Sequence, residues 1–203
     1  MAVAEVTRPP VAPRHPGLHT GMMGMFIFLS SEVMFFGTLF AVYFYMFGSH
    51  PQWPPIGTRG VPAFPLPTVN TVVLLSSGVT MHIGHMAIQR GNRQQLILWL
   101  VVTILLGAAF EVGQAYEFLT AHITFTTNHF TSAFFTMTGF HGGHVLGGII
   151  FLSLILGRTL SGHFDSQHHV GVAACAIYWH FVDLVWVFLY IVLYWGATGA
   201  TGS

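Results

Sequence analysis

Three acidic residues lie deep inside apolar stretches of the sequence. Glu32, Glu111 and Asp183 are half of the six acidic residues in the chain. An ionised carboxyl group at the centre of a membrane helix costs about 2.5–3.5 kcal/mol, so such groups normally face protein, water or a partner. We interpret them, together with His141, His144 and His180, as candidates for a proton relay or a lipid-headgroup contact. The alternative is that each is protonated and ties two helices together. Glu117, near the end of its apolar stretch, is expected to face water.

Five of the thirteen histidines also lie in apolar stretches, and they raise the question of a metal site. They are His82, His85, His141, His144 and His180. The first two are three residues apart, as are the next two, so each pair lies on one face of a helix. A di-iron bundle site needs Glu-x-x-His motifs on two helices, and neither pair has a Glu at that spacing. Haem ligation needs matching depth, whereas the first pair lies nearer a span end than the other three. We predict no metal site, with these histidines neutral and hydrogen-bonded across helices or to lipid and water near an interface.

Two further patterns predict packing and pairing. His180 precedes Asp183 by one helical turn, which predicts a structural hydrogen-bonded pair. Glycines repeat every four residues in the fourth apolar stretch, leaving one helix face as bare backbone against which another helix can pack; they are Gly139, Gly143 and Gly147. No phosphate-binding glycine loop, nucleophile elbow or Cys-x-x-Cys motif occurs. We therefore predict no catalytic centre in this chain.

The composition predicts that these residues are positioned by membrane-spanning helices. Only 6% of the 203 residues are charged and 53% are hydrophobic, whereas soluble domains carry roughly 25% charged residues. The formal net charge is zero, which excludes a nucleic-acid-binding surface. A span needs roughly 20 apolar residues, and five stretches qualify: about 22–47, 67–89, 96–118, 131–157 and 172–195. We predict an all-α bundle of five transmembrane helices, one domain over 22–195, between polar tails at 1–21 and 196–203.

The arginines predict the orientation of this bundle. Five of the six lie on the side of the N-terminus: Arg8, Arg14, Arg90, Arg93 and Arg158. By the positive-inside rule, the N-terminus is cytoplasmic and the C-terminus lies outside. The proline-rich connection 48–66 predicts a surface loop in which Trp53 is an interfacial aromatic residue, and residues 89–94 predict a tight turn.

Four motifs carry a resemblance to a known family. They are Ser-Ser-Glu-Val-Met-Phe-Phe at 30–36, Gln-Ala-Tyr-Glu-Phe at 114–118, Thr-Gly-Phe-His-Gly-Gly-His-Val at 138–145 and Tyr-Trp-His-Phe-Val-Asp-Leu-Val-Trp at 178–186. In order and spacing the chain resembles subunit III of the haem–copper cytochrome c oxidases over about residues 20–195, in the short five-helix form known from bacteria. Many members have a Glu shortly before the last motif, where this chain reads Gly-Val-Ala-Ala-Cys at 171–175.

The resemblance implies an accessory subunit of a proton-pumping terminal oxidase in aerobic electron transport, located in a bacterial plasma membrane. Haem and copper are then expected in partner subunits, and bound phospholipid in this one. The implied partners are oxidase subunit I above all, subunit II, small subunits, membrane lipids, and cytochrome c as electron donor to the complex. The resemblance also implies support for the stability of subunit I and for proton uptake, with Glu32 influencing proton delivery.

Three alternatives remain open at this point. A quinol oxidase subunit III would share the fold and the motifs. A small haem-binding membrane cytochrome would use the histidines, and a proton-coupled carrier would be built around the intramembrane carboxyl groups. The paired, interrupted spans typical of secondary transporters are not evident in the sequence.

Overall fold

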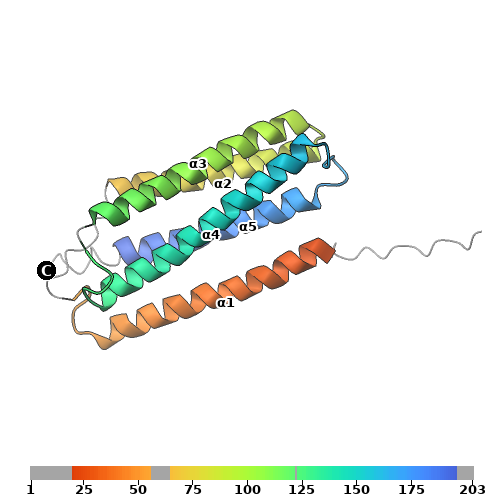
Figure 1. The fold of residues 1–203 in the computed structure, drawn as a ribbon. Helices are drawn as coiled ribbons and strands as arrows, with labels where there is room; N and C mark the ends of the chain where they lie inside the picture. The colour runs from red at the N-terminus through yellow and green to blue at the C-terminus, as the bar shows by residue number, and fades with distance from the viewer. Residues whose placement is uncertain (1–19, 56–64, 122, 196–203) are drawn as a thin grey trace, which may run out of the picture.

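A computed structural model describes residues 20–55, 65–121 and 123–195, and within these ranges the chain is a bundle of long helices with no strand. The elements are α1 Thr20–Ser49, α2 Leu66–Gln89, α3 Arg93–Thr120, α4 His129–Leu160 and α5 Val170–Leu189, which a π-helical turn, η1 Tyr190–Trp195, prolongs (Figure 1). Five of these helices, counting α5 with η1 as one, are long and apolar enough to cross a membrane. The predicted all-α fold with five spans is confirmed. Most of the predicted N-terminal tail and all of the C-terminal tail lie outside the described residues.

Polar caps and one glycine set the helix boundaries. Asn92 caps α3 by accepting a hydrogen bond from the Gln95 backbone N–H at 3.1 Å. Asn128 and Thr131 form a reciprocal capping box at the start of α4, each side chain accepting from the other's backbone N–H at 3.0 Å. Gly91, with φ of 76°, supplies the positive φ that reverses the chain between α2 and α3. The tight turn predicted at 89–94 is confirmed.

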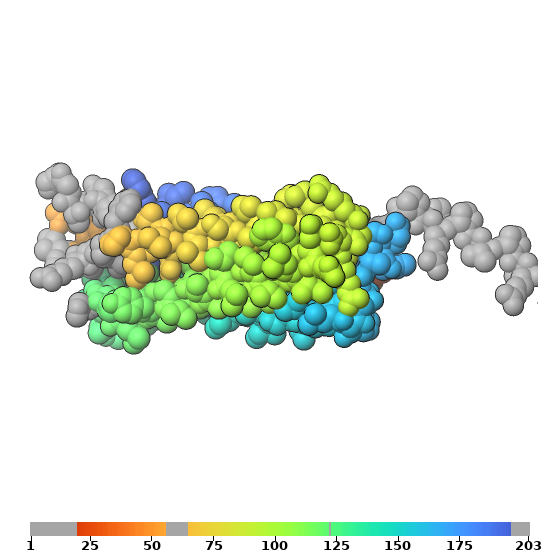
Figure 2. All heavy atoms as spheres, turned by 90° about the horizontal axis from the view of Figure 1, so that it is seen from above, coloured from red at the N-terminus to blue at the C-terminus, as the bar shows by residue number. Residues whose placement is uncertain are grey.

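Helix α5 is the central element of the bundle. It packs against α1, α2 and α4, while α2 and α3 form an antiparallel pair. The pair runs side by side along the whole length of one face (Figure 2). In contrast, α1 buries only Leu29, Phe36 and Tyr43, seven residues apart, so most of its surface faces outward. Helix α1 is therefore attached through one narrow seam.

The closest helix packing centres on Trp179 of α5. A Cβ added at Gly107 of α3 or at Gly148 of α4 would lie 2.8 or 2.7 Å from its ring, so both glycines are needed to admit the indole. The three glycines predicted to form a packing stripe on α4 make no contact as close as these. A Cβ at its first two glycines would meet no atom within 4 Å, and at the third it would lie 3.4 Å from a tyrosine hydroxyl; the three are Gly139, Gly143 and Gly147. Among the described residues, close packing thus falls on other glycines than those predicted.

Trp53 is enclosed by protein. Trp53 is 4% exposed, and its Nε1–H donates to the Tyr43 hydroxyl at 3.0 Å. Tyr43 in turn donates to the carbonyl of Val192 in η1 at 3.2 Å. The prediction of a surface aromatic residue is wrong, because Trp53 packs inward on Tyr43, and Tyr43 fastens α1 to η1 across 149 positions of sequence.

Candidate functional site

The most direct polar contact between α1 and α4 is formed by Glu32 and His144. Nε2 of His144 lies 2.8 Å from Oε2 of Glu32, and the side chains are 19% and 17% exposed. Of the carboxyl groups singled out from the sequence, Glu32 is therefore paired across helices.

The hydrogen bonds of His144 define how many protons the contact holds. Its Nδ1 lies 2.7 Å from the Phe140 carbonyl oxygen, and a carbonyl only accepts, so Nδ1 carries a proton. The Nε2–Oε2 contact then contains one shared proton, located either on the carboxyl group or on the imidazole. Both forms have no net charge, which explains how the pair is tolerated inside an apolar span. The pair can pass its proton from one side chain to the other without charging the membrane interior.

Aromatic rings enclose this pair. The ring centroid of Phe36 lies 4.9 Å and that of Phe35 6.0 Å from the ring of His144. Tyr178 of α5 donates its hydroxyl proton to the backbone carbonyl of His144 at 2.9 Å. These contacts hold the imidazole in its orientation.

His141 faces a different part of the bundle from His144. It is 1% exposed, and its Nε2–H donates to the Val182 carbonyl of α5 at 3.2 Å. Its ring lies 4.9 Å from that of Trp186, and its Nδ1 has no partner among the described residues. The two histidines share a helix face, yet one binds α5 and the other α1, so they do not converge on one ligand.

The structure corrects the depth expected for His82. Its ring centroid lies 6.2 Å from that of His180, so the two are level in the bundle. Helices α2 and α5 run in opposite directions. Positions counted from the start of each helix therefore do not show that His82 and His180 lie at the same level. Within the described parts of the chain, no group of three or more His, Cys, Asp or Glu side chains is arranged to hold a metal ion. The metal-free chain stays a prediction.

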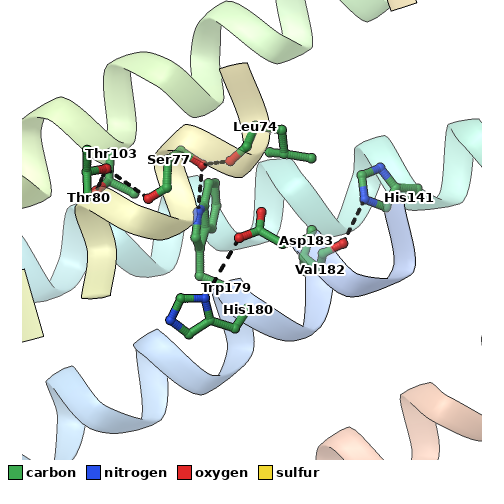
Figure 3. Close-up of polar contacts among 9 residues, drawn as sticks. All are labelled: Leu74, Ser77, Thr80, Thr103, His141, Trp179, His180, Val182 and Asp183. Atoms are coloured by element: carbon green, nitrogen blue, oxygen red, sulfur yellow. Dashed lines mark hydrogen bonds and ion pairs between the residues drawn. The ribbon is translucent and has the colours of Figure 1, made fainter. Parts of the chain in front are cut away.

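Asp183 and His180 lie close together on α5. Nδ1 of His180 is 3.8 Å from Oδ2 of Asp183, the distance of an ion pair rather than of a short hydrogen bond. The carboxyl group points toward α2 (Figure 3), where Gly78 leaves room for it, since a Cβ at Gly78 would collide with Oδ2. The second oxygen, Oδ1, is buried and has no partner in the described residues.

The two carboxyl groups of α3 have separate surroundings. Glu111 lies against α4, where a Cβ added at Gly142 would be 3.6 Å from both of its oxygens. Glu117 is buried, and its Oε2 accepts from the Tyr194 hydroxyl at 2.9 Å and from Gln114 Nε2 at 3.1 Å. The expectation that Glu117 faces water is wrong, because η1 places Tyr194 over it. Gln114, one turn earlier on α3, is the only sequence signal that pointed to this contact.

Five apolar helices, joined by several polar side chains that pair across helices, define a multi-pass helical membrane protein. A family model described as "Cytochrome c oxidase subunit III" matches residues 13–198. The chain belongs to the cytochrome c oxidase subunit III family, and as such it is part of an oxidase complex with other subunits.

Curated relatives agree with this family. The chain is 43% identical to "Cytochrome c oxidase subunit 3" of Thermostichus vulcanus over 184 residues, 90% of each chain. It is 45% identical to the protein of the same name from Aedes aegypti over 190 residues, 88% of this chain and 72% of the relative. For Cyprinus carpio the identity is 46% over 177 residues, 85% of this chain and 68% of the relative. The resemblance predicted from the four motifs is confirmed.

Proposed function

We propose that this chain is the accessory subunit III of a proton-pumping cytochrome c oxidase in a bacterial plasma membrane, and that it has no redox centre of its own. Electrons from cytochrome c then reach oxygen at haem and copper held by partner subunits. The observation that carries the proposal is the family match over residues 13–198, which includes all five helices. The names of the relatives favour cytochrome c over quinol as the donor.

A role in holding phospholipid is supported by a hollow between α1 and α5. It has a volume of about 570 Å³ and is lined between Val33 and Phe44 on α1 and between Phe181 and Val192 on α5 and η1. Every lining residue is apolar or glycine. An acyl chain satisfies such a surface, because it requires no hydrogen bond from its environment. A bound acyl chain would add contact area beside the narrow seam that attaches α1, and it would so stabilise α1 in the bundle.

A role in proton uptake is supported by the Glu32–His144 pair. It holds one exchangeable proton at a contact of 2.8 Å and keeps zero net charge whichever side chain carries it. Release of this proton to a neighbouring acceptor leaves the pair with one negative charge, and uptake of a proton from water makes it neutral again. We assign it the supporting role in proton delivery to subunit I, together with a structural role in fastening α1.

Co-purification tests the proposal. A tagged form of the chain, expressed in its native membrane and extracted in mild detergent, should bring down larger haem-bearing subunits and cytochrome c oxidation activity. Recovery with a complex that oxidises quinol but not cytochrome c would correct the electron donor. Recovery of the chain alone, with haem bound to it, would refute the accessory role.

A further inference from the structure

The motif Gln-Ala-Tyr-Glu-Phe at 114–118 contains two buried polar side chains that take no part in the Glu32–His144 pair. Gln114 and Glu117 are one turn apart near the end of α3, and they are 4% and 6% exposed. Tyr194 of η1 lies over Glu117. Hydrocarbon offers neither donors nor acceptors, so these side chains must satisfy their hydrogen bonds within the protein.

Two hydrogen bonds end on one oxygen of the Glu117 carboxyl group. Its Oε2 accepts from the Tyr194 hydroxyl at 2.9 Å and from Gln114 Nε2 at 3.1 Å. A hydroxyl that donates to an ionised carboxylate forms a shorter bond, of about 2.5–2.7 Å. The bond from Tyr194 is longer than this and has the length expected between neutral groups.

The second oxygens of the two side chains have no donor. Glu117 Oε1 and Gln114 Oε1 are both buried, and neither has a hydrogen-bond partner among the described residues. An amide oxygen only accepts hydrogen bonds, and so do both oxygens of an ionised carboxylate. If Glu117 were ionised, both oxygens would stay unsatisfied. A proton on Glu117 Oε1 turns one of the two acceptors into a donor for the other.

The surroundings of Glu117 also oppose a negative charge. Its two hydrogen-bond donors, a phenol and an amide, are uncharged, and from α4 the ring of Phe134 packs on that of Tyr194 at 5.6 Å. In the part of the chain that the structure describes, no arginine or histidine forms an ion pair with Glu117; the ion pairs are His144 with Glu32, His168 with Asp165 and His180 with Asp183. A buried carboxyl group without a cation is normally neutral, because the isolated charge is costly to desolvate.

We propose that Glu117 holds a bound proton on Oε1 and donates it to Gln114 Oε1, so that the two side chains form a cyclic acid–amide pair. The other half of the cycle is the hydrogen bond from Gln114 Nε2 to Glu117 Oε2. A protonated carboxyl group and a primary amide each offer one donor and one acceptor to such a cycle. The terminal torsions of both side chains are broad, so a rotation about them can close it.

This proton has a structural role that differs from the role of the proton shared by Glu32 and His144. That pair is partly exposed and contains an imidazole, which readily takes up and releases protons. Glu117 is buried between an amide and a phenol, neither of which accepts a proton near neutral pH. The bound proton therefore stays in place, and it keeps the carboxyl group neutral beneath Tyr194. It thereby holds η1 against the end of α3.

Infrared difference spectroscopy of the purified full-length chain tests the proton. The C=O stretching band of a protonated carboxyl group is separate from the bands of carboxylates and amides. Subtracting the spectrum of Glu117→Gln from that of wild type should show the loss of one protonated carboxyl band. The other carboxyl groups are present in both samples and cancel. Loss of carboxylate bands instead would overturn the proposal.

A second substitution tests the partner of the proton. Gln114→Leu removes the amide, so the carboxyl band of Glu117 should shift to higher frequency as its hydrogen bonds are lost. The matched control is Glu111→Gln, which removes another carboxyl group of α3. The shift should persist in the Glu111→Gln background and vanish in the Glu117→Gln background. An unchanged frequency, or a shift that vanishes only with Glu111, would overturn the cyclic pair.

Thermal unfolding provides a test that does not depend on assigning bands. The side chain of Glu117→Gln offers the same donors and acceptors as a protonated glutamic acid, so this variant should unfold close to the wild-type temperature. Glu117→Leu cannot accept from Tyr194 and should unfold at a lower temperature. If Glu117→Gln fails to fold, or unfolds well above or below wild type, a neutral carboxyl group is refuted.

Discussion

Nε2 of His144 and Oε2 of Glu32 lie 2.8 Å apart, and this contact joins the most exposed helix, α1, to α4 across 112 positions of sequence. Because Nδ1 of the same imidazole donates to the Phe140 carbonyl, the two side chains share one proton. The pair therefore combines a structural function with the capacity to exchange a proton.

Replacing Glu32 separates these two functions. Glu32→Gln keeps the size and hydrogen bonding of the side chain but cannot take up or release a proton. We expect normal assembly and haem content, with turnover slowed at high pH, where protons are scarce, or a shorter active lifetime of the enzyme. Oxygen consumption measured across pH and over many turnovers tests this.

The matched control is Glu32→Ala, which leaves Nε2 of His144 without its partner. It should show the same kinetic defect and also weaken retention of the subunit, by at most about 1–3 kcal/mol, the cost of an unsatisfied buried group, because His144 is only partly buried. If the Gln variant were kinetically silent and the Ala variant only lost the subunit, the carboxyl group would be purely structural.

The isolated chain should contain no stoichiometric haem, iron or copper. His141 donates to Val182 and His144 contacts Glu32, so the pair that looked most like a ligand set is used in helix contacts. A visible spectrum and metal analysis of the purified chain measure this. One haem per chain, lost on His141→Ala or His144→Ala, would favour the membrane cytochrome instead.

The arginine distribution predicts which ends of the helices face the cytoplasm. The native cysteine, Cys175, is buried, so thiol labelling reports mainly on introduced sites. Gln94→Cys, beside Arg93 at the start of α3, should react from the cytoplasmic side, and Thr126→Cys, between α3 and α4, from the opposite side. The reverse pattern in sealed vesicles would invert the predicted orientation.

The fit of Trp179 between two glycines makes α4 sensitive to one methyl group. Gly148→Ala would place a Cβ 2.7 Å from the indole, and overpacking of this kind costs about 1–3 kcal/mol. The matched control is Gly143→Ala, where a Cβ meets no atom within 4 Å. Unfolding of the isolated chain should be easier for the first variant and unchanged for the second. Equal effects would mean that the slot around Trp179 is adaptable.

Asp165, in the loop between α4 and α5, should titrate at lower pH than an ordinary aspartate. The backbone N–H groups of His168 and Gln167 donate to its carboxylate at 2.7 Å and lower its pKa. A lowered pKa in the folded state means that the loop is stabilised above the usual aspartate pKa. This stabilisation is lost as the pH falls through the lowered value. Carbon NMR of the carboxyl group gives the pKa directly, and Asp165→Asn should remove the pH dependence of the loop signals in the acidic range in which aspartate titrates.

Some residue-level expectations were confirmed because they depend on local properties of the chain. The turn at 89–94 follows from Gly91, whose positive φ is accessible to glycine. His180 and Asp183 lie close together because they are one turn apart on α5, but at 3.8 Å they do not form the predicted hydrogen bond. Glu117 could not be placed in this way, because its donor Tyr194 is 77 positions away.

The sequence by itself determined the five spans and the family, because crossing hydrocarbon requires about 20 consecutive apolar residues and the motifs are contiguous. Only the tertiary structure decided which polar groups meet. It brought Glu32 to His144 and His82 level with His180, and it buried Asp183 Oδ1 without a hydrogen-bond partner among the described residues. The physical reason is that a pattern along one helix defines its faces, whereas the rotation and depth of each helix are set by packing against the others.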